Sequence, residues 1–194
     1  MTAAITDIVA DLRQDHRNVS VLLTMLEAEL SRMHDGGEAD FELLHDIMHY
    51  MTVYPDAVHH PKEDRLYAEL RAARPDLTAG FQRISMEHRQ IGEAGRSLRD
   101  RFAAIANDAV VSRRDVVADG LRYVNTLRSH MQWEELDLFR RALSMARDGH
   151  RFLTNEQYDA DDPLFGRKVA RPFEALFQQI RRAGEGGGKT ASGA

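Results

Sequence analysis

Two short segments of the sequence place a histidine four residues before a glutamate and follow the glutamate with a second acid. The first segment, HHPKED, runs from His59 to Asp64, and the second, HMQWEE, runs from His130 to Glu135. On an α-helix, residues four apart lie one turn apart on the same face. Each segment can therefore present an imidazole beside a carboxylate. This combination of ligands suits iron and similar transition metals.

The repeated pattern extends upstream of both segments. An acid-His-Arg triplet contains His16 before the first segment, and a second such triplet contains His88 before the second, at nearly equal spacing. One His-x3-Glu match is a weak signal, because charged helices produce it by chance, but two matches with the same upstream partner are strong. The alternative is two solvated helix faces with incidental histidines. The candidate metal ligands are His16, His59, Glu63, His88, His130 and Glu134.

Composition narrows the class of protein. The chain has 194 residues, 43% of them apolar, and a net charge of −5 with acids and bases interspersed. It has no basic surface for nucleic acid and no apolar run that could span a membrane. Its start, MTAAITDIVADLRQDH, carries acids where a signal peptide needs basic and then apolar residues, so we expect a cytoplasmic protein. Cysteine is absent, so any metal must be held by histidine and carboxylate.

Apolar residues recur at helical spacing in four long segments. The segments cover about residues 6–33, 40–72, 78–106 and 112–146. Joined by short connections, they predict an all-α fold, an antiparallel up-down-up-down four-helix bundle. At 1.5 Å rise per residue, the four candidate histidines then fall within roughly 10 Å of one level. Two metal ions bridged by carboxylates fit such a layer, and they would offset the cost of burying these groups.

Helix boundaries and irregularities follow from single residues. Asp40 and Ser112 are expected N-caps, and Pro55 and Pro61 predict a kink or break between Tyr54 and Pro61. The helical pattern weakens after residue 149, and an extra C-terminal helix is expected over residues 171–182. The expected organisation is a bundle over residues 1–150, a turn and helix packed on it over 151–183, and a disordered tail over 184–194.

With these residues in place, the chain resembles the hemerythrin-like (HHE cation-binding) family over about residues 5–147. The family pattern is one histidine on helix one, His-x3-Glu on helix two, one histidine on helix three and His-x3-Glu on helix four. The stretches YPDAVHHPKED and DDPLFG are similar to those of bacterial members with a C-terminal extension. The resemblance implies two iron ions in an oxo- or hydroxo-bridged centre, with Glu63 and Glu134 as the bridging carboxylates.

The chain departs from the oxygen-carrying members at two places. Those proteins have a second histidine one turn along helix three, where this chain has Gly92. They also supply an aspartate five residues after the helix-four histidine, where this chain has Glu134 and Glu135 at four and five. The set is thus one histidine short. His60 is a further candidate ligand, and the alternative is a residue outside the ligand set. Gly92 either allows close helix packing or leaves a coordination position open.

The resulting functional hypothesis is a non-haem di-iron protein that binds or senses oxygen, nitric oxide or peroxide, or that serves iron-linked stress defence. The alternatives are a redox enzyme that decomposes hydrogen peroxide and a metal-free helical scaffold for a partner. The expected partner is a small diatomic ligand or peroxide, not a nucleic acid or a membrane, and no oligomeric state is predicted. Tyr50, Tyr54 and Tyr123 either line the site or fill the core. The remaining histidines, His34, His45, His49 and His150, are expected on solvated surface.

Overall fold

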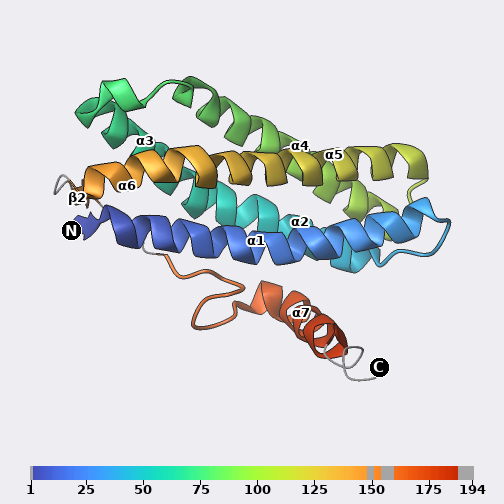
Figure 1. The fold of residues 1–194 in the computed structure, drawn as a ribbon. Helices are drawn as coiled ribbons and strands as arrows, with labels where there is room; N and C mark the ends of the chain where they lie inside the picture. Colours follow the sequence, from blue (N-terminus) through green and yellow to red (C-terminus); the bar gives the residue numbers. More distant parts are fainter. Residues whose placement is uncertain (1, 148–150, 154–159, 188–194) are drawn as a thin grey trace, which may run out of the picture. The chain divides into compact units, whose positions relative to one another are not determined.

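The computed structural model describes residues 2–147, 151–153 and 160–187 (Figure 1). The chain divides into two compact units, residues 1–160 and 161–194. The first unit is a bundle of four long helical segments that alternate in direction, which confirms the predicted all-α fold. Its helical elements are α1 (Ile5–His34), α2 (Phe41–Tyr54), η1 (Pro55–His59), α3 (His60–Ala73), η2 (Pro75–Leu77), η3 (Phe81–Arg83), α4 (Ile84–Ala106), α5 (Arg113–Trp133), η4 (Glu134–Leu138) and α6 (Phe139–Arg147).

The second and fourth helical segments begin at the predicted caps. The side chain of Asp40 accepts a hydrogen bond from Leu43 N at 2.9 Å, and Ser112 Oγ accepts one from Asp115 N at 3.4 Å. Each bond satisfies a backbone donor that the first helical turn leaves free. The α-helix of the third segment begins later than residue 78. Short 3₁₀ turns over 75–77 and 81–83 precede it.

Two π-helical turns interrupt the second and fourth segments without breaking them. In η1, His60 N donates to Pro55 O, and in η4, Phe139 N donates to Glu134 O, so each bond spans five residues. A proline ring crowds the carbonyl four residues back in an α-helix, and a wider π turn relieves that crowding before Pro61. The irregularity predicted between Tyr54 and Pro61 therefore exists, as a π turn in a continuous helix.

A short antiparallel strand pair was not expected from the sequence. Strand β1 (Thr2–Ala4) pairs with β2 (Arg151–Leu153), and Ala3 lies opposite Phe152. Three-residue strands are too short to show an alternating pattern, so periodicity could not reveal them. The pair joins the backbone before α1 to the backbone after α6.

The apolar core lies on both sides of a polar layer. Along α1, Ile8 and Leu12 precede His16, and Leu23 and Leu30 follow it, all buried. One cluster of buried apolar residues combines the start of α1 with α3, α6 and the start of α4. The candidate ligands therefore sit within the bundle, with apolar packing above and below them.

The second unit contains η5 (Arg171–Phe173) and α7 (Glu174–Gly187). Before them, the carboxylate of Asp162 accepts hydrogen bonds from Leu164 N and Phe165 N, which forms the turn predicted in this stretch. The C-terminal helix continues to Gly187, so the expectation of disorder from residue 184 is wrong for residues 184–187, and residues 188–194 lie outside the described residues. Within the described part of the chain, no helix is long and apolar enough to cross a membrane.

Candidate metal centre

Each of the four helical segments of the bundle brings at least one predicted ligand to the polar layer. His16 comes from α1 and His88 from α4. The second segment supplies a His-Glu pair from η1 and α3, and the fourth supplies one from α5 and η4. All six side chains are buried, and both glutamates are fully so. The six candidate ligands are His16, His59, Glu63, His88, His130 and Glu134.

The six side chains form two groups that share Glu63. In the first group, the Nε2 atoms of His16 and His59 lie 3.6 Å and 3.4 Å from Glu63 Oε1. In the second group, His88 Nε2 lies 3.4 Å from the other oxygen of the same carboxylate, Glu63 Oε2. Within each group, the ligand atoms lie within 4.8 Å of one another. The two oxygens of Glu63 therefore face two different sets of imidazoles.

Glu134 is oriented in the same way. Its Oε2 lies 3.5 Å from His16 Nε2. Its Oε1 lies 3.5 Å from His88 Nε2 and 3.2 Å from His130 Nε2. Both carboxylates thus reach from one group of imidazoles to the other, the arrangement that bridging of two metal ions requires.

The spacing of these atoms fits ligands around an ion. Two metal–ligand bonds of about 2.1 Å that meet at octahedral or tetrahedral angles leave the ligand atoms about 3.0–3.4 Å apart. The nitrogen-to-oxygen distances among the six candidate ligands are 3.2–3.6 Å. These distances are longer than good hydrogen bonds between charged groups, which lie near 2.7–2.9 Å. The atoms are therefore arranged around shared points and not in direct contact.

Unsatisfied polar atoms are concentrated in this layer. Buried side-chain nitrogen and oxygen atoms are normally hydrogen-bonded. Among the described residues, every such atom without a partner belongs to one of the candidate ligands, and they include both oxygens of Glu63. The residues concerned are His16, Glu63, His88, His130 and Glu134. Apart from His88 Nδ1, which faces Asp64, bound cations in the layer would satisfy these atoms, so the residues present fit a metal site.

Four further carboxylates, here called the outer acids, contact the ring nitrogens that face away from the layer. Each is the sequence neighbour of one ligand but contacts a histidine on another helix. The pairs are Asp15 Oδ2 with His59 Nδ1 at 3.0 Å, Glu135 Oε1 with His16 Nδ1 at 3.1 Å, Glu87 Oε2 with His130 Nδ1 at 2.9 Å and Asp64 Oδ1 with His88 Nδ1 at 3.4 Å. The last contact is an ion-pair contact without hydrogen-bond alignment. A carboxylate on Nδ1 fixes the ring and leaves Nε2 for a metal.

The outer acids repeat with the two halves of the sequence. Asp15 precedes His16 as Glu87 precedes His88, and Asp64 follows Glu63 as Glu135 follows Glu134. The sequence pattern contained these acids, but their role as partners of histidines on neighbouring helices was not predicted.

Tyr67 makes the two halves unequal. Its hydroxyl donates a 2.8 Å hydrogen bond to Glu134 Oε1. Tyr67 lies four residues after Glu63, and the corresponding residue after Glu134 is Leu138, which packs in the apolar core. Glu134 therefore has a fixed donor from the protein that has no counterpart at the equivalent position beside Glu63.

The electrostatics of the metal-free layer favour charged imidazoles and ionised carboxylates. Burial by itself lowers the pKa of His16 and of His88, but contacts with the surrounding carboxylates outweigh it and raise both pKa values well above the usual value. Burial raises the pKa of Glu63 and of Glu134, yet the imidazoles around them bring both below the usual value. Metal-free protein therefore balances two buried carboxylates with protons on imidazoles.

His60 lies beside the layer but in neither group of ligand atoms. Its ring stacks on that of His88 with 4.2 Å between centroids, and its Nδ1 lies 3.4 Å from Asp56 Oδ1. Burial lowers the pKa of His60 to about 4, against the opposing effect of Asp56. The structure thus places His60 against the candidate ligand His88, as a neutral ring stacked on it.

The space next to Gly92 is filled, which supports the packing explanation for this glycine. A Cβ built at Gly92 would lie 3.1 Å from Asp56 Oδ2 and 3.1 Å from Arg96 Nη1. Asp56 and Arg96 form an ion pair at 2.7 Å. This ion pair occupies the place of the missing side chain, which favours close packing over an open coordination position at Gly92.

A small cavity instead adjoins the layer at another place. It has a volume of about 20 Å³, and its walls include His16, His59, His130 and Glu134. Such a volume holds about one molecule of the size of water. Tyr123 also lines this cavity, so for this tyrosine the first of the two alternatives, a place beside the site, is correct. Tyr50 and Tyr54 are buried and stack on each other.

The remaining histidines do not join the layer. His34 is exposed, and His45 and His49 are partly exposed and stack on each other. His150 lies outside the described residues. The family model of the hemerythrin HHE cation binding domain matches residues 7–148.

The chain belongs to the hemerythrin HHE cation-binding family. Searches among curated proteins and among solved structures found no match. The family match includes all four helical segments of the bundle apart from residues 5 and 6, and the buried cluster of histidines and glutamates in this HHE domain fits a metal site.

Proposed function

We propose that this HHE domain binds two iron ions and presents them to a small ligand. His16 and His59 would hold one ion, and His88 and His130 would hold the other. Glu63 and Glu134 would bridge them, because each directs its two oxygens to different groups of imidazoles. The single observation that carries this proposal is the sharing of Glu63 between the two groups of ligand atoms.

We propose iron as the metal because this ligand set matches that of non-haem iron sites. The ligands are imidazoles and carboxylates, without thiolates, as in non-haem iron sites. When bound, iron would supply redox chemistry and a position at which small molecules coordinate. The protein itself orients the imidazoles through the outer acids and surrounds the layer with apolar packing.

The size of the adjoining cavity favours a small ligand. A volume of about 20 Å³ admits one molecule of the size of water, and a diatomic such as oxygen or nitric oxide is comparable. We infer that the domain binds or senses a diatomic molecule or a peroxide. A scaffold without metal would leave several buried carboxylate oxygens and ring nitrogens of the layer without hydrogen-bond partners, which is costly.

Ligand binding to iron-loaded protein tests this function. Aerobically loaded protein is titrated with azide, and reduced protein with nitric oxide, while the visible absorption is followed. We expect spectral changes that saturate in the parent and in His45→Ala, and that are lost in His16→Ala. Hydrogen peroxide consumption is measured on the same samples, and rapid turnover would identify the peroxide-decomposing alternative. Fully loaded protein that responds to none of the three compounds would overturn the proposal.

A further inference from the structure

A surface groove between α4 and α5 ends at the wall of the internal cavity. Two hollows on this face, of about 450 Å³ and 360 Å³, share Gln90, Ile91 and Thr126. Ile91 also lines the internal cavity beside the candidate ligands. Of the residues that line the cavity, Ile91 is the one that both outer hollows share.

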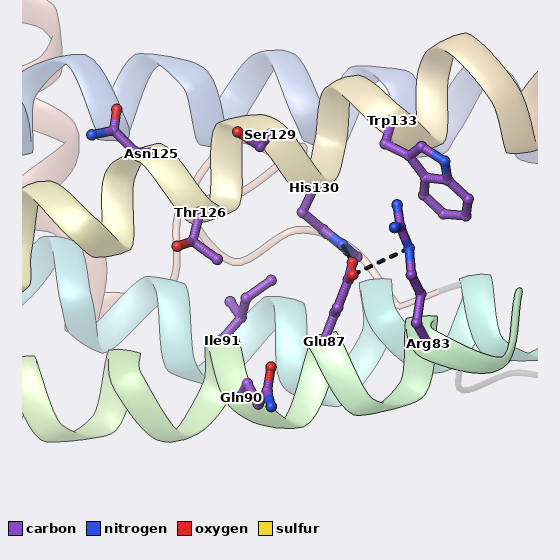
Figure 2. A pocket seen from close by; sticks show the side chains of 9 residues that line it. All are labelled: Arg83, Glu87, Gln90, Ile91, Asn125, Thr126, Ser129, His130 and Trp133. Atoms are coloured by element: carbon purple, nitrogen blue, oxygen red, sulfur yellow. Dashed lines mark hydrogen bonds and ion pairs between the residues drawn. The ribbon is translucent and has the colours of Figure 1, made fainter. Parts of the chain in front are cut away.

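The side chain of Ile91 lies between the surface groove and the cavity. It is 4% exposed, with the groove on one side and the cavity on the other. Figure 2 shows it extending from α4 toward α5, between the exposed Thr126 and the Glu87–His130 contact. Tyr123 likewise lines both the second hollow and the cavity. No other residue of α4 lines the cavity among the described residues.

We propose that small ligands reach the metal layer between α4 and α5, and that Ile91 controls the rate of their passage. This inference rests on the proposed function, because it concerns access to the same site. A β-branched side chain in a helix is largely restricted to one χ1 rotamer, so Ile91 does not swing aside freely. The barrier therefore depends on the size of the side chain at residue 91.

A second route, between α1 and α5, is less suitable. A hollow there is lined by Met131 and His16, which both also line the cavity. Passage on that side would displace a candidate ligand whose ring is held by Glu135 at 3.1 Å. It would also pass charged groups such as Arg128, which is paired with Glu27 at 2.8 Å. On the α4–α5 face, His130 lines the first hollow, but the second hollow shares only Ile91 and Tyr123 with the cavity, and both lie outside the set of candidate ligands.

The test measures the association and dissociation rates of nitric oxide with reduced, iron-loaded protein by stopped-flow absorption. Ile91→Ala should raise both rates roughly tenfold, a barrier change of ~1.4 kcal/mol, and Ile91→Phe should lower both. The equilibrium affinity should stay near that of the parent, because a change in a barrier affects both directions equally. Ile91→Val supplies a milder variant should the larger changes impair folding, and iron content is matched throughout.

Ile84→Ala is the matched control. Ile84 is the same residue type on the same helix, two turns earlier, and it is buried in the apolar cluster away from the cavity. Ile84→Ala should bind and release nitric oxide at the rates of the parent protein. Parent-like rates in all Ile91 variants, or rate changes in Met131→Ala without changes in Ile91→Ala, would overturn the proposed route. Absence of nitric oxide binding in the loaded parent would instead contradict the proposed function itself.

Discussion

Asp15 contacts His59 and not its own sequence neighbour His16: Asp15 Oδ2 lies 3.0 Å from His59 Nδ1. The other ring nitrogen of His59 faces Glu63 Oε1 at 3.4 Å. The carboxylate of Asp15 therefore determines which nitrogen is available to a metal. Glu87 likewise contacts His130 on another helix and not its sequence neighbour His88. The outer acids therefore link the helices, as do Glu63 and Glu134.

Replacing Asp15 by alanine should weaken metal binding without removing a ligand. Loss of a carboxylate that orients a metal-binding imidazole typically lowers affinity about 10- to 100-fold. The affinity is measured by anaerobic competition for Fe(II) with a chelator. Asp7→Ala, an exposed aspartate on the same helix, serves as the control and should match the parent. Equal affinities for Asp15→Ala and Asp7→Ala would show that the Asp15 contact does not matter for binding.

Tyr67→Phe should destabilise the metal-free protein while leaving all six ligands in place. The variant removes the 2.8 Å bond to the buried carboxylate of Glu134, and hydrogen bonds to charged groups contribute roughly 1.5–3 kcal/mol. The measurement is denaturation of metal-free protein followed by circular dichroism. We expect that protein to stay helical, because apolar packing surrounds the layer. A free energy of unfolding equal to that of the parent would contradict this role of Tyr67.

Gly92→Leu should lower stability and leave ligand access unchanged. The new side chain must displace the Asp56–Arg96 ion pair, which lies 3.1 Å from the position of its Cβ. Overpacking of this kind costs roughly 1–3 kcal/mol. Ala94→Leu, at an exposed position on the same helix, is the control for stability. If Gly92→Leu keeps parental stability and instead blocks nitric oxide binding at full iron content, an open coordination position, and not close packing, would explain the glycine at residue 92.

Loading of metal should release protons at neutral pH. Without metal, the carboxylates raise the pKa of His16 and His88 well above the usual value, so both rings carry protons. A metal requires the neutral imidazole, so binding displaces those protons and affinity rises with pH. The release is measured with a pH indicator in weakly buffered solution as Fe(II) is added. Uptake of protons, or a metal affinity that falls as pH rises, would contradict the predicted release of protons.

The clustering of the six candidate ligands was predictable because their pattern repeats in the sequence. His16 with the His59 and Glu63 pair, and His88 with the His130 and Glu134 pair, follow helical spacing, and four antiparallel helices place them at one level. The caps at Asp40 and Ser112 were likewise predictable, because capping is local chemistry.

Contacts between helices could not be predicted in the same way. Successive residues on a helix point in different directions, so Asp15 reaches a different helix from His16, and periodicity does not say which one. The bond from Tyr67 to Glu134 crosses between segments for the same reason. The filling of the space at Gly92 depends on Asp56, which lies on another helical segment.

The number of iron ions that each chain binds, measured by anaerobic Fe(II) titration with elemental analysis, tests the central claim most directly. The parent and His45→Ala should both saturate at about two iron ions per chain, as expected of a carboxylate-bridged pair of metal ions. Glu63→Ala should lose most binding at both positions, because the two groups of ligand atoms share this carboxylate. Saturation of the parent at a single ion, or full loading of Glu63→Ala, would contradict a two-metal centre bridged by Glu63.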